Sequence, residues 1–315
     1  MTSNNLDAFD LDIPGRQSGK VRESWPLTGD QRLLVTTDRL SAFDRVIGTV
    51  THKGQVLNQL AAWWFEQTSD IVANHVVSLP DPNALIAVDA KPLPVEVIVR
   101  GRLTGSTSTS VLPRYLAGER RLYGYDLPDG LEPHGPLPTP LITPTTKAEK
   151  GGHDEPVTCD EVTELGLVES ALWDQVQDAA MALFMRGTEV AAEAGFVLAD
   201  TKYEFGLDPA GGLVVIDEMH TPDSSRFWLE STLADRLADG KTPESFDKEP
   251  VRLALRAVGY TGDGSPPQMD DEVWESASAR YVEIYERLTG ENFVPGQQPV
   301  SDRLAKNLAP LVADL

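Results

Sequence analysis

The chain has 315 residues, enough for one large domain or two lobes, and it is strongly acidic, with 49 Asp and Glu against 27 Lys and Arg. A formal net charge of -22 argues against a nucleic-acid or anionic-membrane surface, so local clusters of basic residues become informative. A single cysteine, Cys159, excludes a disulfide framework within the chain, and no Cys/His spacing resembles a zinc site. The polar first residues do not form a signal peptide and no stretch approaches a membrane span, so we expect a cytoplasmic protein.

Residues 15–37 predict a hairpin with glycines in it. The Gly19-Lys20 pair suggests a P-loop, but its spacing is one residue short and Val21 replaces the Ser or Thr that would bind magnesium. A P-loop also leads into a helix, whereas this segment leads into a strand. The remaining signal is that Lys20 and Arg22 alternate onto one face, where they either lie over a polyphosphate or are simply solvated.

The segment after this hairpin predicts a polar loop, a helix and a strand. Residues 38–44 form the loop, and residues 52–65 have the apolar spacing of an amphipathic helix with its tryptophans in the core. Residues 91–100 predict a strand that places Glu96 and Arg100 on one face.

Five arginines lie beside a Gly/Ser/Thr loop, residues 101–110. Arginine forks and hydroxyls fit phosphate oxygens, and each charged hydrogen bond contributes about 1.5–3 kcal/mol. In a chain this acidic the cluster predicts a phosphate-monoester site, most strongly at Arg100 and Ser106. The alternative is a surface patch that pairs with nearby acids. The five residues are Arg100, Arg102, Arg114, Arg120 and Arg121.

The remainder of the chain predicts a long loop followed mostly by helices. Residues 126–158 are rich in proline, glycine and polar residues, which is typical of a functional or disordered segment. Apart from a central hairpin, helical patterns then cover residues 160–194, 224–239, 244–258, 270–288 and 301–309, the last of them ended by Pro310.

The central hairpin consists of two apolar runs on either side of a turn at residues 208–212. In the first run Asp200, Lys202 and Glu204 share one face. If the loop has four residues, Glu204 lies opposite Asp217 on that same face; a three-residue loop with a glycine bulge would place Asp217 on the other face. We predict the first register.

Two carboxylates at cross-strand distance repel each other unless a proton or a cation lies between them. Oxygen ligands suit Mg²⁺, which keeps waters and substrate phosphates in its other positions. The alternative is a solvated polar face, but the apolar runs at residues 196–198 and 214–216 indicate a buried hairpin, in which charges need partners. The sequence therefore predicts a magnesium site at Glu204 and Asp217.

Five segments follow one another along the chain in a recognisable order: Gly19-Lys-Val-Arg22, Ser41-Ala-Phe-Asp44, Pro94–Arg100 with Gly105-Ser106, Asp200–Gly206 and Asp217–Arg226. Each is weakly informative alone, and together they are highly specific. They resemble the phosphoribosylaminoimidazole-succinocarboxamide synthase (SAICAR synthetase) family. The loop at residues 147–155 and the long C-terminal part resemble the longer, single-chain members, so we expect a monomer.

The resemblance implies a two-lobed α+β fold with ATP in the cleft between the lobes. Residues 1–100 would form a β-rich lobe that cradles ATP and resembles the small lobe of protein kinases. Residues 101–315 would form a larger mixed α/β lobe with substrate loops at 101–158, the metal-binding hairpin at 196–219 and a helical tail at 224–315.

The implied reaction joins L-aspartate to the carboxylate of carboxyaminoimidazole ribonucleotide (CAIR) in purine biosynthesis. ATP phosphorylates the carboxylate to an acyl phosphate, the aspartate amine attacks, and the products are SAICAR, ADP and phosphate. A carboxylate is a poor electrophile, and phosphorylation gives it a good leaving group. Phosphoryl transfer depends on positioning and charge neutralisation, so no nucleophilic residue is required.

The resemblance also assigns roles to individual residues. ATP would contact Gly19, Lys20 and Arg22, with Lys91 and Glu96 bordering the adenine. Lys202 would neutralise charge at the transferring group, and Glu204 and Asp217 would carry Mg²⁺. The ribonucleotide would contact Arg100, Ser106 and Arg226. For the aspartate pocket the candidates are Asp44, Lys53, Asp154 and Glu155.

Two other functions compete with this one. A kinase on the same scaffold is disfavoured because the His-Arg-Asp and Asp-Phe-Gly segments are missing at kinase spacing. A nucleotide-binding protein without catalysis would be expected to have lost its metal ligands, whereas Glu204 and Asp217 are both present.

Overall fold

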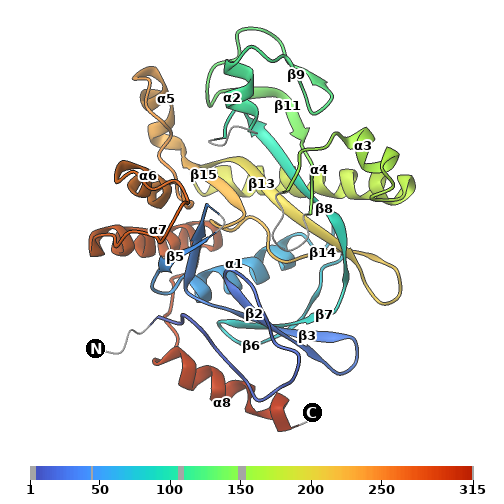
Figure 1. Ribbon diagram of the computed structural model, residues 1–315, viewed down its shortest axis with the longest axis vertical. Helices are drawn as coiled ribbons and strands as arrows, with labels where there is room; N and C mark the ends of the chain where they lie inside the picture. Colours follow the sequence, from blue (N-terminus) through green and yellow to red (C-terminus); the bar gives the residue numbers. More distant parts are fainter. Residues whose placement is uncertain (1–4, 44, 106–109, 148–153, 314–315) are drawn as a thin grey trace.

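The computed structural model describes residues 5–43, 45–105, 110–147 and 154–313. The described chain forms an α+β structure of two lobes, each built on an antiparallel sheet (Figure 1). Helix α1 (Lys53–Gln67) lies where the two lobes meet, at the position expected from its apolar spacing. None of the described helices is both long and apolar enough to cross a membrane.

The smaller lobe contains a five-stranded sheet. The predicted hairpin is confirmed: its two strands, β2 and β3, pair on either side of a turn at residues 28–30. A further short strand, β1, pairs with β2, and in the turn between these two the amide of Gly19 donates to the carbonyl of Arg22 at 2.8 Å. In sheet order the strands are β1 (Gln17–Ser18), β2 (Arg22–Leu27), β3 (Gln31–Thr36), β7 (Ala84–Val88) and β6 (Val76–Asp81).

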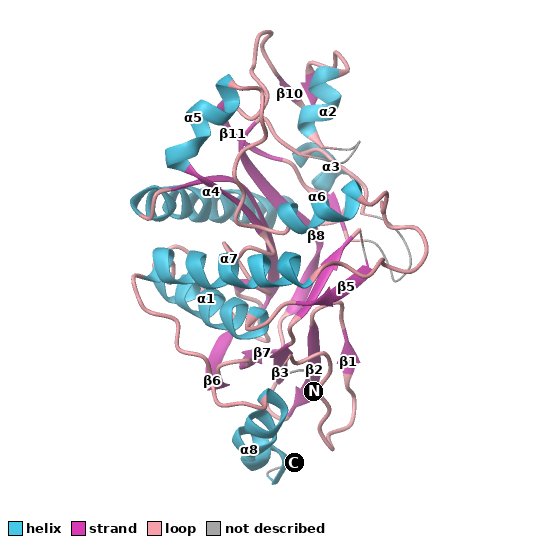
Figure 2. Cartoon of the chain, turned by 90° about the vertical axis from the view of Figure 1, so that its left-hand side faces the viewer, coloured by secondary structure: helices cyan, strands magenta, loops and turns pink. Residues whose placement is uncertain are grey.

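The last helix, α8 (Val300–Ala313), covers this small sheet (Figures 1 and 2). Leu304 and Leu308 are fully buried against the sheet, together with side chains of the N-terminal residues 6–13. The expectation that Pro310 ends this helix is wrong. Proline removes only one backbone hydrogen bond, and apolar side chains beyond it still pack against the core.

The larger lobe contains a six-stranded sheet. Strand β8 runs through residue 100, where the sequence places the lobe boundary, and all its pairing partners belong to this sheet. The central path is β11 (Pro136–Ile142), β8 (Lys91–Arg102), β13 (Phe196–Leu207) and β14 (Leu213–Ile216); β12 (Thr145–Thr146) pairs with β8, and β15 (Ser225–Leu229) pairs with β13.

Helices α1, α4 (Ser170–Glu193) and α7 (Asp271–Thr289) lie together on one side of this sheet (Figure 2). Their buried side chains form the main core with those of β8 and β13. Helix α7 confirms the predicted amphipathic helix and ends at Gly290, whose φ of 73° is readily available to glycine.

Three other expectations about secondary structure are wrong. The expected helix at residues 160–194 is interrupted after α3 (Cys159–Glu164), where Gly166 turns the chain with a φ of 69°. The start of the expected helix at 224–239 is instead β15, because its aromatic side chains are buried in the sheet before α5 (Glu230–Ala238) begins. The expected loop at 38–44 contains a strand, β4 (Arg39–Ala42), which pairs with β5 (Arg45–Thr49).

The remaining described elements belong to the larger lobe. Helix α2 (Val111–Leu116) and the short strands β9 (Arg121–Leu122) and β10 (Tyr125–Asp126) lie at its end far from the small sheet (Figure 1). Helix α6 (Glu249–Ala257) packs against α7, with Val251 and Leu255 in the main core.

Candidate active site

The turn that carries Gly19 and Lys20 is fixed by Arg39 from β4. The Arg39 guanidinium donates from Nε to the carbonyl of Lys20 and from Nη2 to that of Gly19, both at 3.0 Å. Its Nη1 also lies 2.6 Å from the buried carboxylate of Glu23. The exposed turn therefore has a rigid base. Sequence reasoning missed Arg39, because it lies in a segment that reads as a polar loop.

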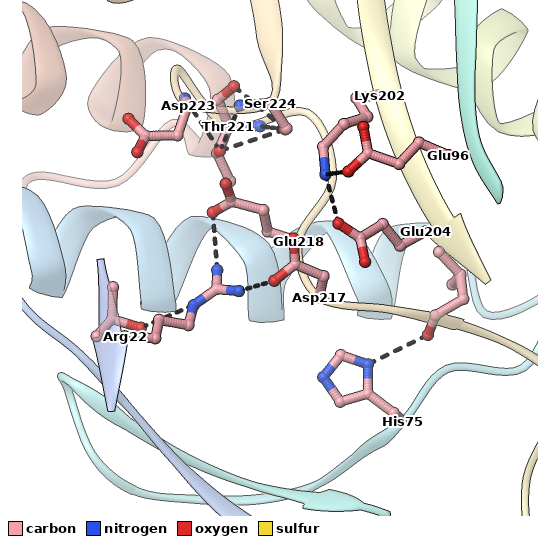
Figure 3. Close-up of polar contacts among 12 residues, drawn as sticks. Arg22, His75, Glu96, Lys202, Glu204, Asp217, Glu218, Thr221, Asp223 and Ser224 are labelled. Carbon is pink, nitrogen blue, oxygen red and sulfur yellow. Dashed lines mark hydrogen bonds and ion pairs between the residues drawn. The ribbon is translucent and has the colours of Figure 1, made fainter. Parts of the chain in front are cut away.

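Arg22 reaches from the small lobe to the larger one (Figure 3). Its Nη1 forms an ion pair with Oδ1 of Asp217, and its Nη2 donates to Oε2 of Glu218 at 2.8 Å. Only 14% of the Arg22 side chain is exposed, so these charge-assisted contacts are largely shielded from water. The guanidinium thus connects the two sheets at the candidate site.

The predicted register of the central hairpin is wrong by one residue. Glu204 pairs with Ile216 rather than with Asp217, and the loop has five residues. The cause is Asp208, whose Oδ1 accepts hydrogen bonds from the amides of Ala210 (2.9 Å) and Gly212 (2.8 Å) and so stabilises a longer loop.

Asp217 nevertheless lies near Glu204. It follows the last residue of β14 and has a left-handed backbone with a φ of 67°, which redirects its side chain. Figure 3 shows both carboxylates facing the same space between the lobes.

Lys202 lies at the centre of this charged group. Its Nζ contacts Oε1 of Glu204 and lies 3.1 Å from Oε1 of Glu96, while Lys147 forms an ion pair with the other oxygen of Glu204. Burial alone would lower the pKa of Lys202, but the charges of Glu204, Asp217 and Glu96 raise it well above its usual value. Lys202 is therefore a fixed cation and not a proton acceptor near neutral pH.

The carboxylate cluster consists of Glu96, Glu204, Asp217 and Glu218. Although burial opposes ionisation of Asp217, the charges of Arg22 and Lys202 hold its pKa below the usual range. Burial raises the pKa of Glu218, which Arg22 only partly offsets, and the pKa of Glu96 is raised by burial as well.

No group of three or more His, Cys, Asp or Glu side chains in the described part of the chain is arranged to hold a metal ion by itself. The donor set still fits Mg²⁺, which takes oxygen ligands and commonly combines one or two carboxylates with phosphates and waters. Glu204 and Asp217 supply such oxygens, and the cations that now neutralise them show that the site favours positive charge.

A second cluster lies on the same face of the sheet. Asp200 in β13 pairs across the sheet with Arg100 in β8 and with Arg226 in β15. Its Oδ2 lies 2.7 Å from Nη1 of Arg100 and 2.5 Å from Nη1 of Arg226. One carboxylate thus orients two guanidinium groups, which leaves an excess of positive charge.

This arginine pair lines a cavity of about 250 Å³. Lys202 belongs to its wall as well, so the cavity adjoins the carboxylate cluster. The basic residues outnumber the acidic ones, which suits an anionic ligand. The charged residues of the wall are Arg100, Lys202, Arg226, Lys248 and Arg252 with Asp200, Asp223 and Asp247.

Asp223 is held from three sides. Its Oδ2 lies 2.9 Å from the ammonium groups of both Lys53 and Lys248, and its Oδ1 accepts from the hydroxyl of Tyr281 at 2.6 Å. Although burial opposes ionisation, the two lysine charges hold the pKa of Asp223 far below its usual range. Lys53 is fully buried, so it reaches the cavity only through Asp223.

The structure separates other predicted residues from the arginine pair. Arg114, Arg120 and Arg121 form local ion pairs with Glu119, Asp129 and Asp126, so the expectation that they join Arg100 in one phosphate site is wrong. Within the described residues, Arg102 does not line the cavity of the arginine pair.

Other predicted residues are exposed or lie outside the described part. Lys91 is exposed at the start of β8, and Asp154 and Glu155 are exposed after β12. Asp44 and Ser106 lie outside the described residues.

Sequence reasoning also missed several residues of the site. Glu218 and Asp223 lie in a segment that resembles the family, and their positions between Asp217 and Arg226 were a usable signal. Lys248 and Arg252 lie in and beside α6, where a pattern of charges typical of a solvated helix gave no signal.

Known proteins resemble this chain over most of its length. A family model described as SAICAR synthetase matches residues 16–269. The phosphoribosylaminoimidazole-succinocarboxamide synthase of Legionella pneumophila (strain Lens) is 46% identical over 308 residues, which are 96% of this chain and 97% of that protein.

Solved structures show the same fold. The SAICAR-synthase from Saccharomyces cerevisiae complexed with SAICAR matches with a TM-score of 0.79 and 30% identity over 92% of this chain and 100% of that one. A SAICAR synthetase (Type-2) in complex with ADP shares the fold with a TM-score of 0.68 and 24% identity, over 89% of this chain and 100% of that one.

The fold, the charged site between the lobes and these similarities define an ATP-dependent ligase. The chain belongs to the SAICAR synthetase family, whose members act in purine biosynthesis.

Proposed function

We propose that this enzyme condenses L-aspartate with CAIR through an acyl-phosphate intermediate and releases SAICAR, ADP and phosphate. The observation that carries the proposal is the position of Lys202. Its ammonium contacts Glu204 of the carboxylate cluster, and its side chain also lines the cavity of the arginine pair. A phosphoryl donor on one side and an anionic acceptor on the other would meet at this cation.

The ribonucleotide fits the cavity of the arginine pair. Arg100 and Arg226 are oriented by Asp200, so their remaining N–H groups are available to phosphate or carboxylate oxygens without further ordering. The L-aspartate carboxylates require cations too, and Lys248 is the candidate because it lines the same cavity. Lys53 would act indirectly, by holding Asp223.

ATP fits the other side of the site. The rigid turn at Gly19 and Lys20 and the guanidinium of Arg22 supply backbone and side-chain donors for its phosphates. The segment from Lys91 to Glu96, where the chain passes from the small sheet to the large one, would border the adenine.

Phosphoryl transfer would then occur beside Lys202. As the γ-phosphoryl group moves to an oxygen of the CAIR carboxylate, Lys202 neutralises the charge on the transferring group and stays protonated throughout. Mg²⁺ bound by Glu204 and Asp217 would neutralise further phosphate charge. The neutral amine of aspartate attacks the acyl carbon, the carbon–oxygen bond to phosphate breaks, and phosphate leaves with that oxygen. The nitrogen gives up one proton as the amide forms.

An isotope experiment tests the acyl phosphate. CAIR labelled with ¹⁸O in its carboxylate is converted with ATP and L-aspartate, and the released phosphate is analysed by mass spectrometry. Phosphate with one ¹⁸O from each labelled carboxylate supports the proposal. Unlabelled phosphate would show that ATP is cleaved without phosphorylating the carboxylate.

A further inference from the structure

The first turn of α8, the last helix of the described chain, carries a buried polar network against the small sheet. Arg303 of α8 holds Asp81 of β6 in a fork, with Nε 2.9 Å from Oδ2 and Nη2 3.1 Å from Oδ1. Only 7% of the Arg303 side chain is exposed, and that of Asp81 is fully buried. The same Nη2 donates to Oδ1 of Asn83 at 2.5 Å. The guanidinium therefore fixes an amide side chain as well as an acid.

Asn83 in turn is hydrogen-bonded to the neighbouring strand, β3. Its Nδ2 donates to the carbonyl of Thr36 in β3 at 3.0 Å, and the amide of Thr36 donates back to the carbonyl of Asn83 at 2.8 Å. The space around this pair is closed by Gly54 of α1. A Cβ at Gly54 would lie 2.4 Å from the Thr36 oxygen and 2.6 Å from Nδ2 of Asn83. Helix α1 therefore blocks movement of the pair towards Gly54.

Thr36 faces Arg22. The two residues are direct partners across β2 and β3, and Nε of Arg22 lies 3.4 Å from Oγ1 of Thr36. The other end of the Arg22 guanidinium contacts Asp217 and Glu218. Side-chain and backbone contacts therefore run from the C-terminal helix to the cation that joins the lobes.

We propose that Arg303 is a positioning residue for Arg22, so that the C-terminal helix sets the geometry of the nucleotide phosphate site. The inference rests on the proposed role of Arg22 in binding ATP. Its physical basis is that a lysine would keep a charge beside the buried Asp81 carboxylate, whereas the planar fork of arginine contacts both oxygens of Asp81 and also Asn83.

Three variants of the full-length enzyme test the inference. Arg303→Lys keeps a charge beside Asp81 but loses the fork. Asn83→Ser removes the side-chain hydrogen bond to the Thr36 carbonyl and leaves the contacts between Arg303 and Asp81 in place. Leu308→Ala is the matched control, because Leu308 is a fully buried apolar residue of the same helix against the same sheet. KM values for ATP and CAIR, kcat and melting temperature are measured for each.

The expected result is a KM for ATP raised about threefold to tenfold in Arg303→Lys and Asn83→Ser, with the KM for CAIR unchanged. Leu308→Ala is expected to lower the melting temperature at least as much without changing the KM for ATP. The double variant Arg303→Lys/Asn83→Ser is expected to raise the KM for ATP no further than the more affected single variant, because both act on one path.

Two results would overturn the inference. One is an unchanged KM for ATP in Arg303→Lys, or in Asn83→Ser if Arg303→Lys does not fold. The other is a change that tracks melting temperature equally in all three variants, since that is what a purely structural role produces. Arg22→Lys separates this failure from that of the proposed function: if it leaves ATP binding intact, the assignment of Arg22 to ATP is itself wrong.

Discussion

Arg22 and Asp217 are 195 positions apart in the chain, and their ion pair joins the small lobe to the large one. In the function proposed above, Arg22 would serve as a cation for phosphates and Asp217 as a carboxylate for a metal, and the pair places both at the same junction. Because Asp217 follows the end of β14 with a left-handed backbone, its side chain meets both Arg22 and the space beside Glu204. The site therefore depends on the relative placement of two sheets and not on one hairpin alone.

Replacing Asp217 tests the metal site. Asp217→Asn keeps the size of the side chain but removes its charge, so we expect loss of most turnover while circular dichroism and melting temperature show a folded protein. Asp239→Asn, at an exposed acid in a local pair with Lys241, is the control and should keep full activity. An unchanged kcat in Asp217→Asn would remove this residue from the metal site.

Replacing Arg100 or Arg226 tests whether the arginine pair binds CAIR and not ATP. Arg100→Ala or Arg226→Ala removes a charged hydrogen-bond donor, and we expect the affinity for CAIR to fall by about 1.5–3 kcal/mol, or roughly tenfold to over a hundredfold. Isothermal titration with each substrate measures it, with the exposed Arg121→Ala as the control. Equal losses for ATP and CAIR would contradict the assignment.

Gly187 in α4 lies against the ring of His220, in the segment after β14, and the absence of a side chain at Gly187 leaves space for that ring. Glycine to alanine in a helix normally stabilises it by about 1 kcal/mol. Here the added Cβ would lie 2.4 Å from Cε1 of the buried His220 ring, so overpacking of about 1–3 kcal/mol should reverse the sign. We expect Gly187→Ala to lower the free energy of unfolding in urea titrations. A stabilised variant would show that the ring has room to move.

His75 predicts a pH-dependent stability. Its Nδ1–H donates to the carbonyl of Val215 at 3.2 Å, and burial lowers its pKa to about 4 from the usual 6.5. Between these values the unfolded chain binds more protons than the folded one. The free energy of unfolding therefore falls as pH drops from 6.5 towards 4, by about 3 kcal/mol from this residue.

The variant His75→Asn keeps a donor for Val215 but does not titrate. We expect its loss of stability between pH 7 and pH 4.5 to be smaller than that of the wild type by about 2–3 kcal/mol. Denaturant titrations at the two pH values measure the difference. Equal losses in both proteins would show that His75 is not responsible.

Much of the local structure follows from the sequence. Alternation along residues 200–204 correctly places Lys202 and Glu204 on one face of β13, and apolar spacing predicts α1 and α7. The register of the hairpin does not follow, because it is decided by two hydrogen bonds that the side chain of Asp208 makes within its own loop.

The complete site follows from the sequence only in part. Contacts such as Lys53 with Asp223, or Arg39 with the turn at Gly19, depend on how separate elements pack, and no local pattern encodes that. From the sequence, a lysine at the start of an amphipathic helix is expected to be solvated, whereas Lys53 is fully buried. The family resemblance supplies the chemistry, whereas the geometry comes from tertiary structure.

The most direct measurement of the central claim is ADP formation by the purified enzyme with ATP and Mg²⁺, assayed with CAIR and L-aspartate together, with each alone, and with an alcohol acceptor in place of both. We predict one ADP for each SAICAR, sustained turnover only when both substrates are present, and none with the alcohol. Sustained phosphoryl transfer to the alcohol, or ADP formation at the full rate without L-aspartate, would contradict the account.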